Sequence, residues 1–175
     1  TLFPYPALCR SEAAGDGCDG IEGLLGGAGA DTLDGGLGFD TASYADAAEA
    51  LVLDLGAPGL NAGAAAGDLL LGVEEVLGTA LADRITGDGL GNALRGEGGS
   101  DWLSGALGND AVYGGEGDDT LVGGAGADRL EGAHGNDRLE GGDGDDVLAG
   151  GVGADTFVFS SGADVMSGVE GLEEK

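Results

Sequence analysis

A nine-residue unit repeats without a gap through the second half of this chain. Five successive units, beginning at Gly114, read GGEGDDTLV, GGAGADRLE, GAHGNDRLE, GGDGDDVLA and GGVGADTFV. Their shared pattern is G-G-x-G-x-D-x-L-x, with a carboxylate at the sixth position and an apolar residue at the eighth. Because glycine adopts positive φ at little cost, the fixed glycines favour a turn in every unit. A short, constant period of this kind is typical of a solenoid, in which each unit stacks on its neighbours.

The register of this repeat holds from residue 78 to residue 158, which is nine units of nine residues. The sixth positions are Asp83, Asn92, Asp101, Asp110, Asp119, Asp128, Asp137, Asp146 and Asp155. The eighth positions are Ile85, Leu94, Leu103, Val112, Leu121, Leu130, Leu139, Leu148 and Phe157, and all of them are apolar. Low sequence complexity alone would not keep these two columns in phase.

A shorter block of the same repeat precedes it in residues 17–43. The two units in residues 26–43 fit the pattern well and carry Asp31 and Asp40 at the sixth position. The unit that begins at residue 17 fits loosely, with Glu22 in that place.

Residues 44–77 interrupt the pattern. The run ALVLDL places leucine at every second position, as in a half-buried strand. The run DLLLGVEEVL contains two short apolar stretches around a glycine, and APGLNAGAAAG between the two runs reads as a loop. The simplest interpretation is a set of irregular coils that continue the same solenoid. A short helix around residues 45–50 is the less favoured alternative.

These observations divide the chain into five segments. Cys9 and Cys18 lie at its start, and their spacing permits either a small disulfide loop or two free thiols. Because the chain begins with Thr1 rather than methionine, we expect a processed product or a fragment. The expected segments are an N-terminal extension (1–16), the first repeats (17–43), the irregular insert (44–77), the main repeat array (78–158) and a C-terminal cap or tail (159–175).

The composition indicates that folding needs help from a cation. Glycine makes up 41 of the 175 residues, aromatic residues are 5%, and 33 acidic against 6 basic residues give a net charge of −27. Such a chain buries little apolar surface against its ordering entropy, and its self-repulsion opposes compaction. The periodic leucines argue against a disordered acidic tail. The periodic aspartates indicate a hard cation as the missing source of stability.

The spacing also predicts where that cation binds. We expect a turn over G-G-x-G-x-D and a three-residue strand over x-L-x, so that two units form one coil of 18 residues with strands in two opposed sheets. Stacked coils place unit n over unit n+2, about 4.8 Å away. Asp119 and Asp137 then face a common gap, in which Ca²⁺ would remove their repulsion and accept turn carbonyls. Ca²⁺ fits better than Mg²⁺ because it tolerates about six to eight ligands, and Zn²⁺ is disfavoured by the lack of clustered cysteine and histidine.

The candidate gaps differ in quality. All units from residue 96 onward keep glycine at the fourth position, whereas Leu81 and Leu90 stand there in the two preceding units, and Asn92 replaces aspartate. We therefore expect about five strong Ca²⁺ sites, and weak ones before them. The N-terminal block could add one site that uses Asp40 with Glu22 or with the insert. The strong gaps pair Asp101 with Asp119, Asp119 with Asp137, Asp137 with Asp155, Asp110 with Asp128, and Asp128 with Asp146; the further candidate ligands are Asp31, Asp40, Asp83 and Asn92.

These nonapeptides resemble the RTX (repeats-in-toxin, haemolysin-type) calcium-binding repeats of serralysin-type proteases, type I secreted lipases, haemolysins and alginate epimerase modules. The resemblance implies an all-β fold, a right-handed parallel β-roll (a calcium-bound β-solenoid) with two short parallel sheets. It also implies type I secretion from a bacterium, a secreted, extracellular or periplasmic location, and folding on contact with calcium. The ending DVMSGVEGLEEK lacks the Asp-Phe motif of such domains, so the secretion signal is either a short acidic variant or has been lost or removed.

Catalysis is not expected from this chain. It has no HExxH or GxSxG motif, and His134, its one histidine, falls in a turn where a surface role is expected. No apolar run is long enough to span a membrane, and so acidic a surface disfavours nucleic acid.

Two functions remain. The favoured one is a non-catalytic calcium-binding module that serves as a structural or secretion module, or as a subunit of a larger extracellular assembly. The alternative is a recognition module that binds carbohydrate, a surface or a partner protein along one face, with the outward-facing Trp102 and Tyr113 as contacts. One outward column reads Trp102, Thr120, Arg138 and Thr156, which is too irregular for a repeated binding row and favours the first function.

Overall fold

A computed structural model describes residues 19–20, 23–158 and 160–168 of the chain. The expected extension 1–16, the pair Cys9 and Cys18, and Glu22 lie outside the described residues. So does part of the expected C-terminal segment, namely Phe159 and residues 169–175.

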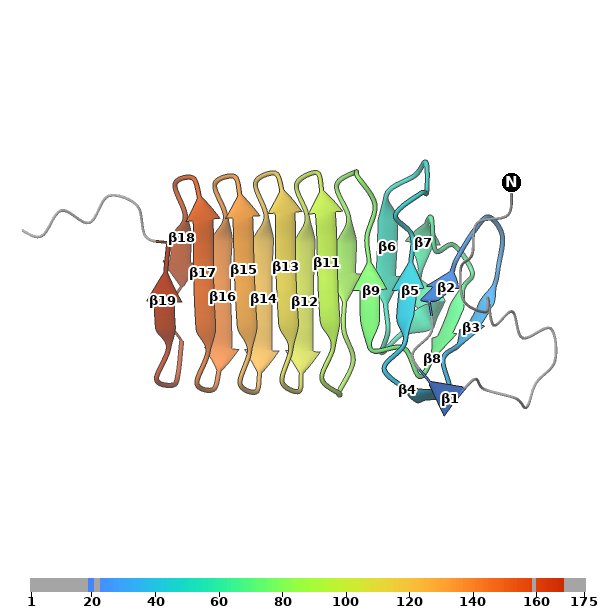
Figure 1. Cartoon of the computed structure of the whole chain (residues 1–175), viewed down its shortest axis with the longest axis horizontal. Helices are drawn as coiled ribbons and strands as arrows, with labels where there is room; N and C mark the ends of the chain where they lie inside the picture. The colour runs from blue at the N-terminus through green and yellow to red at the C-terminus, as the bar shows by residue number, and fades with distance from the viewer. Residues whose placement is uncertain (1–18, 21–22, 159, 169–175) are drawn as a thin grey trace, which may run out of the picture.

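The repeat array forms a stack of parallel coils (Figure 1). Successive strands alternate between two sheets, and partners within a sheet are 18 residues apart, as for Leu103 and Leu121. This register confirms the predicted parallel β-solenoid with two units per coil. The strands of the array are β10 (Arg84–Thr86), β11 (Ala93–Gly98), β12 (Trp102–Leu107), β13 (Ala111–Glu116), β14 (Thr120–Ala125), β15 (Arg129–His134), β16 (Arg138–Asp143), β17 (Val147–Val152), β18 (Thr156–Val158) and β19 (Val165–Ser167).

One apolar side chain per strand fills the core between the two sheets. Leu103, Leu121 and Leu139 stack in one column, and each has 0% of its surface exposed, while the residues on either side of them face outward. Burying a leucine of this kind contributes about 1.5–3 kcal/mol. The eighth-position column therefore supplies the regular part of the hydrophobic core.

The strands are longer than the sequence pattern predicted. β12 to β17 each have six residues, so that positions 1–3 of every unit belong to a strand and only positions 4–6 remain for the turn. The prediction of three-residue strands was wrong because the first glycine of each unit faces inward and extends the strand past the core residue. In β14, for example, both Leu121 and Gly123 are buried.

The insert adds strands to the two main sheets and forms a separate two-stranded sheet with the first repeats. β6 (Leu51–Asp54) pairs with β10, β9 (Glu75–Leu77) lies between β5 (Thr41–Ser43) and β11, and β8 (Leu69–Leu71) pairs with β3 (Thr32–Asp34). The alternation predicted for ALVLDL is confirmed, since Leu51 and Leu53 are buried.

Other parts of the insert differ from expectation or had no prediction. Residues 45–50 form turns and bends, not the helix weighed as an alternative. The expected loop contains a 3-10 helix (Pro58–Leu60) and β7 (Ala62–Gly63), which pairs antiparallel with β6. Among the described residues no helix has the length and apolar character needed to cross a membrane.

The first repeats form the N-terminal end of the solenoid, at the right of Figure 1. β2 (Gly23–Leu25) pairs with β5, and β1 (Asp19–Gly20) pairs with β4 (Leu37–Gly38) in a separate two-stranded sheet. The core is broader here, because Tyr44, Leu70 and Val73 join the eighth-position residues in the same buried cluster.

Candidate metal centre

The sixth-position aspartates form a hydrogen-bonded ladder along each edge of the solenoid. The backbone N–H of Asp119 donates to Oδ1 of Asp137, and the N–H of Asp101 donates to Oδ1 of Asp119, both at 2.8 Å. The structure brings together all five pairs predicted from the spacing. Their N–H to Oδ1 distances are 2.8 Å for Asp101–Asp119, Asp110–Asp128 and Asp119–Asp137, 2.9 Å for Asp128–Asp146, and 3.0 Å for Asp137–Asp155.

The second carboxylate oxygen of these residues is buried and lacks a hydrogen-bond partner. Among the described residues this holds for Oδ2 of every sixth-position aspartate of the array from residue 101 to residue 155. A buried carboxylate oxygen without a donor is costly unless a proton or a cation neutralises it. The ladder therefore presents a row of oxygen atoms suited to a positive charge.

The pKa values of the ladder carboxylates reflect the same environment. Burial raises the pKa of Asp101 to about 7 and the pKa values of Asp110 and Asp119 to about 6. A backbone N–H donor opposes this rise, and the negative charge of the next carboxylate in the ladder adds to it. Burial also raises the pKa values of Asp128, Asp137 and Asp146, in the same direction.

Each Oδ2 from Asp101 to Asp155 packs against the first glycine of its own unit, and in several units a carbonyl of the next coil lies at the same glycine. A methyl group on Gly132 would lie within 3.0 Å of both Asp137 Oδ2 and the Gly150 carbonyl oxygen. Gly114 has the same relation to Asp119 Oδ2 and the Gly132 carbonyl oxygen. A carboxylate oxygen and a carbonyl oxygen thus pack close together against each of these glycines, and both are ligand types that Ca²⁺ prefers.

Backbone oxygens have to complete any such site. Within the described part of the chain, no three histidine, cysteine, aspartate or glutamate side chains converge as a metal-binding group. A gap between two coils supplies two carboxylates, so the turn carbonyls would provide most of the remaining ligands.

Two of the further candidates are held by their own turns instead. Asp83 accepts the Thr79 N–H at Oδ2 (2.6 Å) and both the Leu51 N–H (2.7 Å) and the Thr79 hydroxyl (2.8 Å) at Oδ1. Asn92 accepts the Asp88 N–H at Oδ1 (2.9 Å). The turn N–H therefore reaches these two side chains, whereas Oδ2 of the later aspartates lacks a donor among the described residues.

The N-terminal candidates pair with acidic residues of the insert that the sequence pattern did not reveal. The N–H of Asp31 donates to Asp68 Oδ1, and the N–H of Asp40 donates to Glu74 Oε2, both at 2.9 Å. Asp68 and Glu74 thus continue the ladder without the nine-residue spacing. A usable signal was their place two residues before the central apolar residue of a predicted strand.

A tenth repeat at the C-terminal end was also missed. Asp146 donates its N–H to Asp164 Oδ1 at 3.2 Å, and β19 pairs with β17 in the same register as the earlier strands. The 18-residue spacing and the fourth-position Gly162 were the available signals.

Comparison with protein families agrees with this geometry. A family model described as the RTX calcium-binding nonapeptide repeat (4 copies) matches residues 24–42, 77–112, 95–130, 113–144 and 131–166. The chain belongs to this RTX repeat family. The resemblance inferred from the nonapeptides is thereby confirmed. A comparison with curated proteins found no match.

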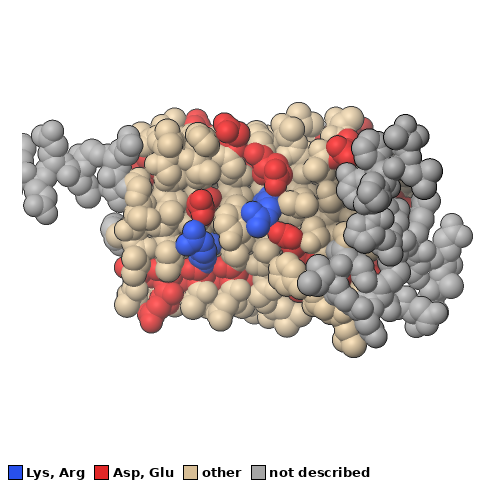
Figure 2. All heavy atoms as spheres, viewed as in Figure 1, with Lys and Arg blue, Asp and Glu red and all other residues tan. Residues whose placement is uncertain are grey.

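The aromatic residues Trp102 and Tyr113 and the single histidine of the RTX chain lie on its surface. The guanidinium of Arg84 lies 3.6 Å from the Trp102 ring centroid, and that of Arg95 lies 4.3 Å from the Tyr113 centroid. The His134 side chain is 61% exposed and lies beside an exposed glutamate. Figure 2 shows basic side chains on one flat face of the solenoid, each adjoining acidic ones.

Proposed function

We propose that this RTX chain is a non-catalytic calcium-binding module that folds on Ca²⁺ outside the cytoplasm. It serves as a structural or secretion module, or as a subunit of a larger assembly. The observation that carries this proposal is the row of buried aspartate Oδ2 atoms that lack a hydrogen-bond donor among the described residues, each packed against the first glycine of its unit.

The proposed ligands are the ladder carboxylates together with glycine carbonyls. Bound Ca²⁺ would supply positive charge between carboxylates that otherwise repel one another. The backbone holds each carboxylate in place, because its Oδ1 accepts the N–H of the preceding coil while its Oδ2 stays available. The proposed ligand residues are Asp101, Asp110, Asp119, Asp128, Asp137, Asp146 and Asp155, with Asp164 added by the tenth unit.

The usual affinity of extracellular calcium modules and the family both support a location outside the cytoplasm. Extracellular calcium modules bind with Kd values of roughly 10⁻⁴–10⁻³ M. At such affinities the net charge of −27 would keep the chain from compacting where calcium is scarce. RTX repeats are typical of type I secreted proteins, and this supports the same location.

Calcium titration tests the proposal directly. Isothermal calorimetry and far-ultraviolet circular dichroism of the full chain would be measured in CaCl₂, in MgCl₂ and in chelator. We expect saturable heat and a gain of β signal with Ca²⁺ only, since ligand that binds the folded state alone stabilises it. An unchanged spectrum in chelator together with no calcium-binding heat would contradict the proposal.

The recognition function is the second candidate. The surface aromatic residues are the evidence that ranks it below the structural function. The rings of Trp102 and Tyr113 each have an arginine of the same chain stacked on one face, so part of each ring is already covered. The structural function therefore stays the leading one. Size-exclusion chromatography with light scattering in calcium would reveal whether the chain assembles with itself.

A further inference from the structure

The turns of this solenoid fall into two classes that differ at the second position of the unit. From residue 97 to residue 151 the second residue has a positive φ, even where it is not glycine, as at Glu97 (72°), Ala106 (79°) and Ala133 (78°). Gly27 and Gly36, which hold this position in the N-terminal units, also have a positive φ. Thr79 and Asp88, which hold it in the first two units of the array, do not. The two classes of turn therefore differ in backbone conformation at the second position of the unit.

This change decides whether the turn satisfies its own sixth-position side chain. Where φ is negative, the second-position N–H donates to that side chain, from Thr79 to Asp83 Oδ2 at 2.6 Å and from Asp88 to Asn92 Oδ1 at 2.9 Å. Where φ is positive, the N–H does not reach the side chain, and Oδ2 lacks a donor within the described residues, as at Asp101 and Asp119. Turns of the first class close themselves, and turns of the second class leave a buried charge to be neutralised.

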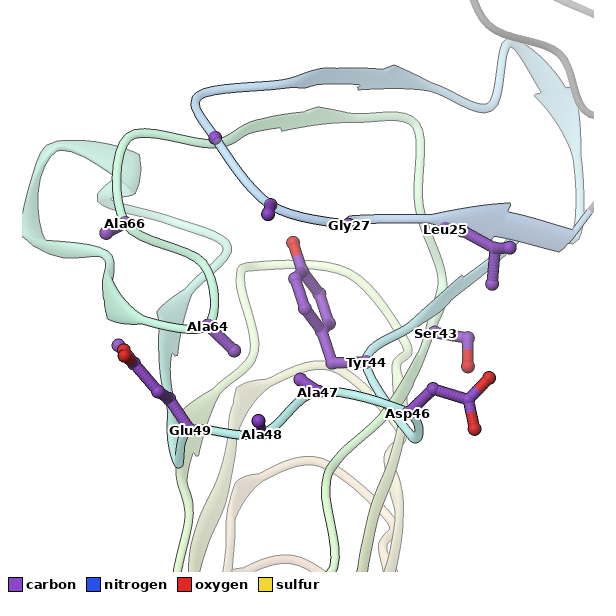
Figure 3. Close-up of a pocket in the computed structure, with 13 residues that line it drawn as sticks. Leu25, Gly27, Ser43, Tyr44, Asp46, Ala47, Ala48, Glu49, Ala64 and Ala66 are labelled. Atoms are coloured by element: carbon purple, nitrogen blue, oxygen red, sulfur yellow. The ribbon is translucent and has the colours of Figure 1, made fainter.

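A third self-closed position lies in the insert. The Tyr44 hydroxyl donates to Asp68 Oδ2 at 2.8 Å, while the Asp31 N–H donates to Asp68 Oδ1 at 2.9 Å. Tyr44 and Asp68 are each only 2% exposed, and burial raises the Tyr44 pKa, which keeps its hydroxyl a neutral donor. Figure 3 shows the tyrosine ring standing between the segment at Gly27 and the side of Ala64, in the wall of a pocket of about 620 Å³.

The core supports the same division. Residues 24–94 bury a cluster that includes Tyr44, Leu70 and Val73 in addition to the eighth-position column, whereas the later coils bury one apolar side chain per strand. Hydrophobic burial per coil is therefore larger at the N-terminal end, where the turns also have their own donors.

We propose that residues 44–94 form a calcium-independent base, and that the coils from residue 95 onward need calcium and add to this base. The second-position residue sets the class of each turn. The inference rests on the proposed calcium-binding function, and it adds a direction to folding: calcium orders the chain from β11 toward β19.

Hydrogen exchange with mass spectrometry on the full chain, in calcium and in chelator, tests the inference. We expect both parts to be protected in calcium. In chelator, β6, β8, β9 and β10 should stay protected, whereas β12 to β17 should exchange at the rate of an unstructured chain. Loss of protection in both parts together, or retained protection in both, would overturn the inference while calorimetric calcium binding remained. No calcium-binding heat and no effect of calcium on exchange would overturn the proposed function, and this inference with it.

Two variants probe the self-closed turns in chelator. Tyr44→Phe removes the donor to Asp68 Oδ2, and Thr79→Val removes a hydroxyl donor to Asp83. Each leaves a buried carboxylate with one donor fewer, so exchange in β6, β8 and β10 should speed up by about tenfold. Tyr113→Phe, the same chemical change on the outer face, should leave exchange unchanged. Equal exchange in Tyr44→Phe and Tyr113→Phe would contradict the proposed role of the buried hydroxyl.

Discussion

The Asp119 N–H donates a 2.8 Å hydrogen bond to Asp137 Oδ1, while Asp137 Oδ2 is buried beside Gly132 with no donor among the described residues. The two oxygens of one carboxylate thus have different roles. Oδ1 fixes the stacking of successive coils, and Oδ2 is available to a cation. A substitution can therefore remove cation binding by Oδ2 and keep the stacking bond of Oδ1.

Asp137→Asn should lower calcium affinity and spare the stacking bond. The amide oxygen can still accept the Asp119 N–H, but the charge in two gaps is lost. Asp137→Asn should therefore lose more bound calcium in a calorimetric titration than Asp155→Asn, because Asp155 faces only one strong gap. Asp118→Asn, an exposed neighbour whose oxygen accepts the Asn136 N–H, is the control for charge. Equal losses for Asp137→Asn and Asp155→Asn would show that the gaps do not act independently along the ladder.

Gly132→Ala should block one proposed site without backbone strain. Gly132 does not have a positive φ, but a methyl group there would lie within 3.0 Å of Asp137 Oδ2 and the Gly150 carbonyl oxygen. We expect loss of about one calcium ion per chain by calorimetry. Gly98→Ala is the matched control, since a methyl group there meets its nearest atom at 3.8 Å. A full calcium complement in Gly132→Ala would remove this gap from the set of proposed sites.

The sequence predicted the regular parts of the fold and of the site, and it failed where contacts have no period. Leu121, Leu139 and the Asp119–Asp137 pair followed from counting residues, because a solenoid converts sequence spacing directly into stacking. The bond from Tyr44 to Asp68 joins residues 24 apart in an irregular segment, so no spacing rule could reveal it. Strand length was underestimated because the sequence does not reveal that the first glycine of each unit faces the core and continues the strand.

In chelator, a fall in pH should shift the coils from residue 95 onward from the unfolded toward the folded state. Burial raises the folded-state pKa of Asp101 to about 7 and those of Asp110 and Asp119 to about 6. The folded state therefore binds more protons than the unfolded state between pH of about 4 and about 7. The stability from these groups is fully present below about pH 4 and is lost as pH rises through the folded pKa values. The far-ultraviolet circular dichroism of the chain in chelator at pH 5 and pH 7.5 would measure the difference in β structure.

The control for this pH effect is Asp101→Asn, which should show a smaller difference between the two pH values. Reduced net charge at low pH also stabilises the acidic chain, and the variant separates the two causes because it leaves the general effect nearly intact. In calcium the direction should reverse, since protons and cations compete for the same carboxylates. An identical pH dependence in the variant and the parent would contradict the raised Asp101 pKa.

Leu130→Ala should destabilise the calcium-bound solenoid by about 2–5 kcal/mol, as expected for a large-to-small change in a packed core. Leu130 has 0% of its surface exposed and lies between the partner strands of its sheet, opposite Val112 and Leu148. In a solenoid each coil contacts only its neighbours, so a cavity in a central coil weakens the interfaces on both sides. Leu107→Ala, at a position that is 59% exposed, is the control and should change stability by less than about 0.5 kcal/mol. Urea unfolding in saturating calcium measures both variants, and similar midpoints would mean that the eighth-position column does not carry the core.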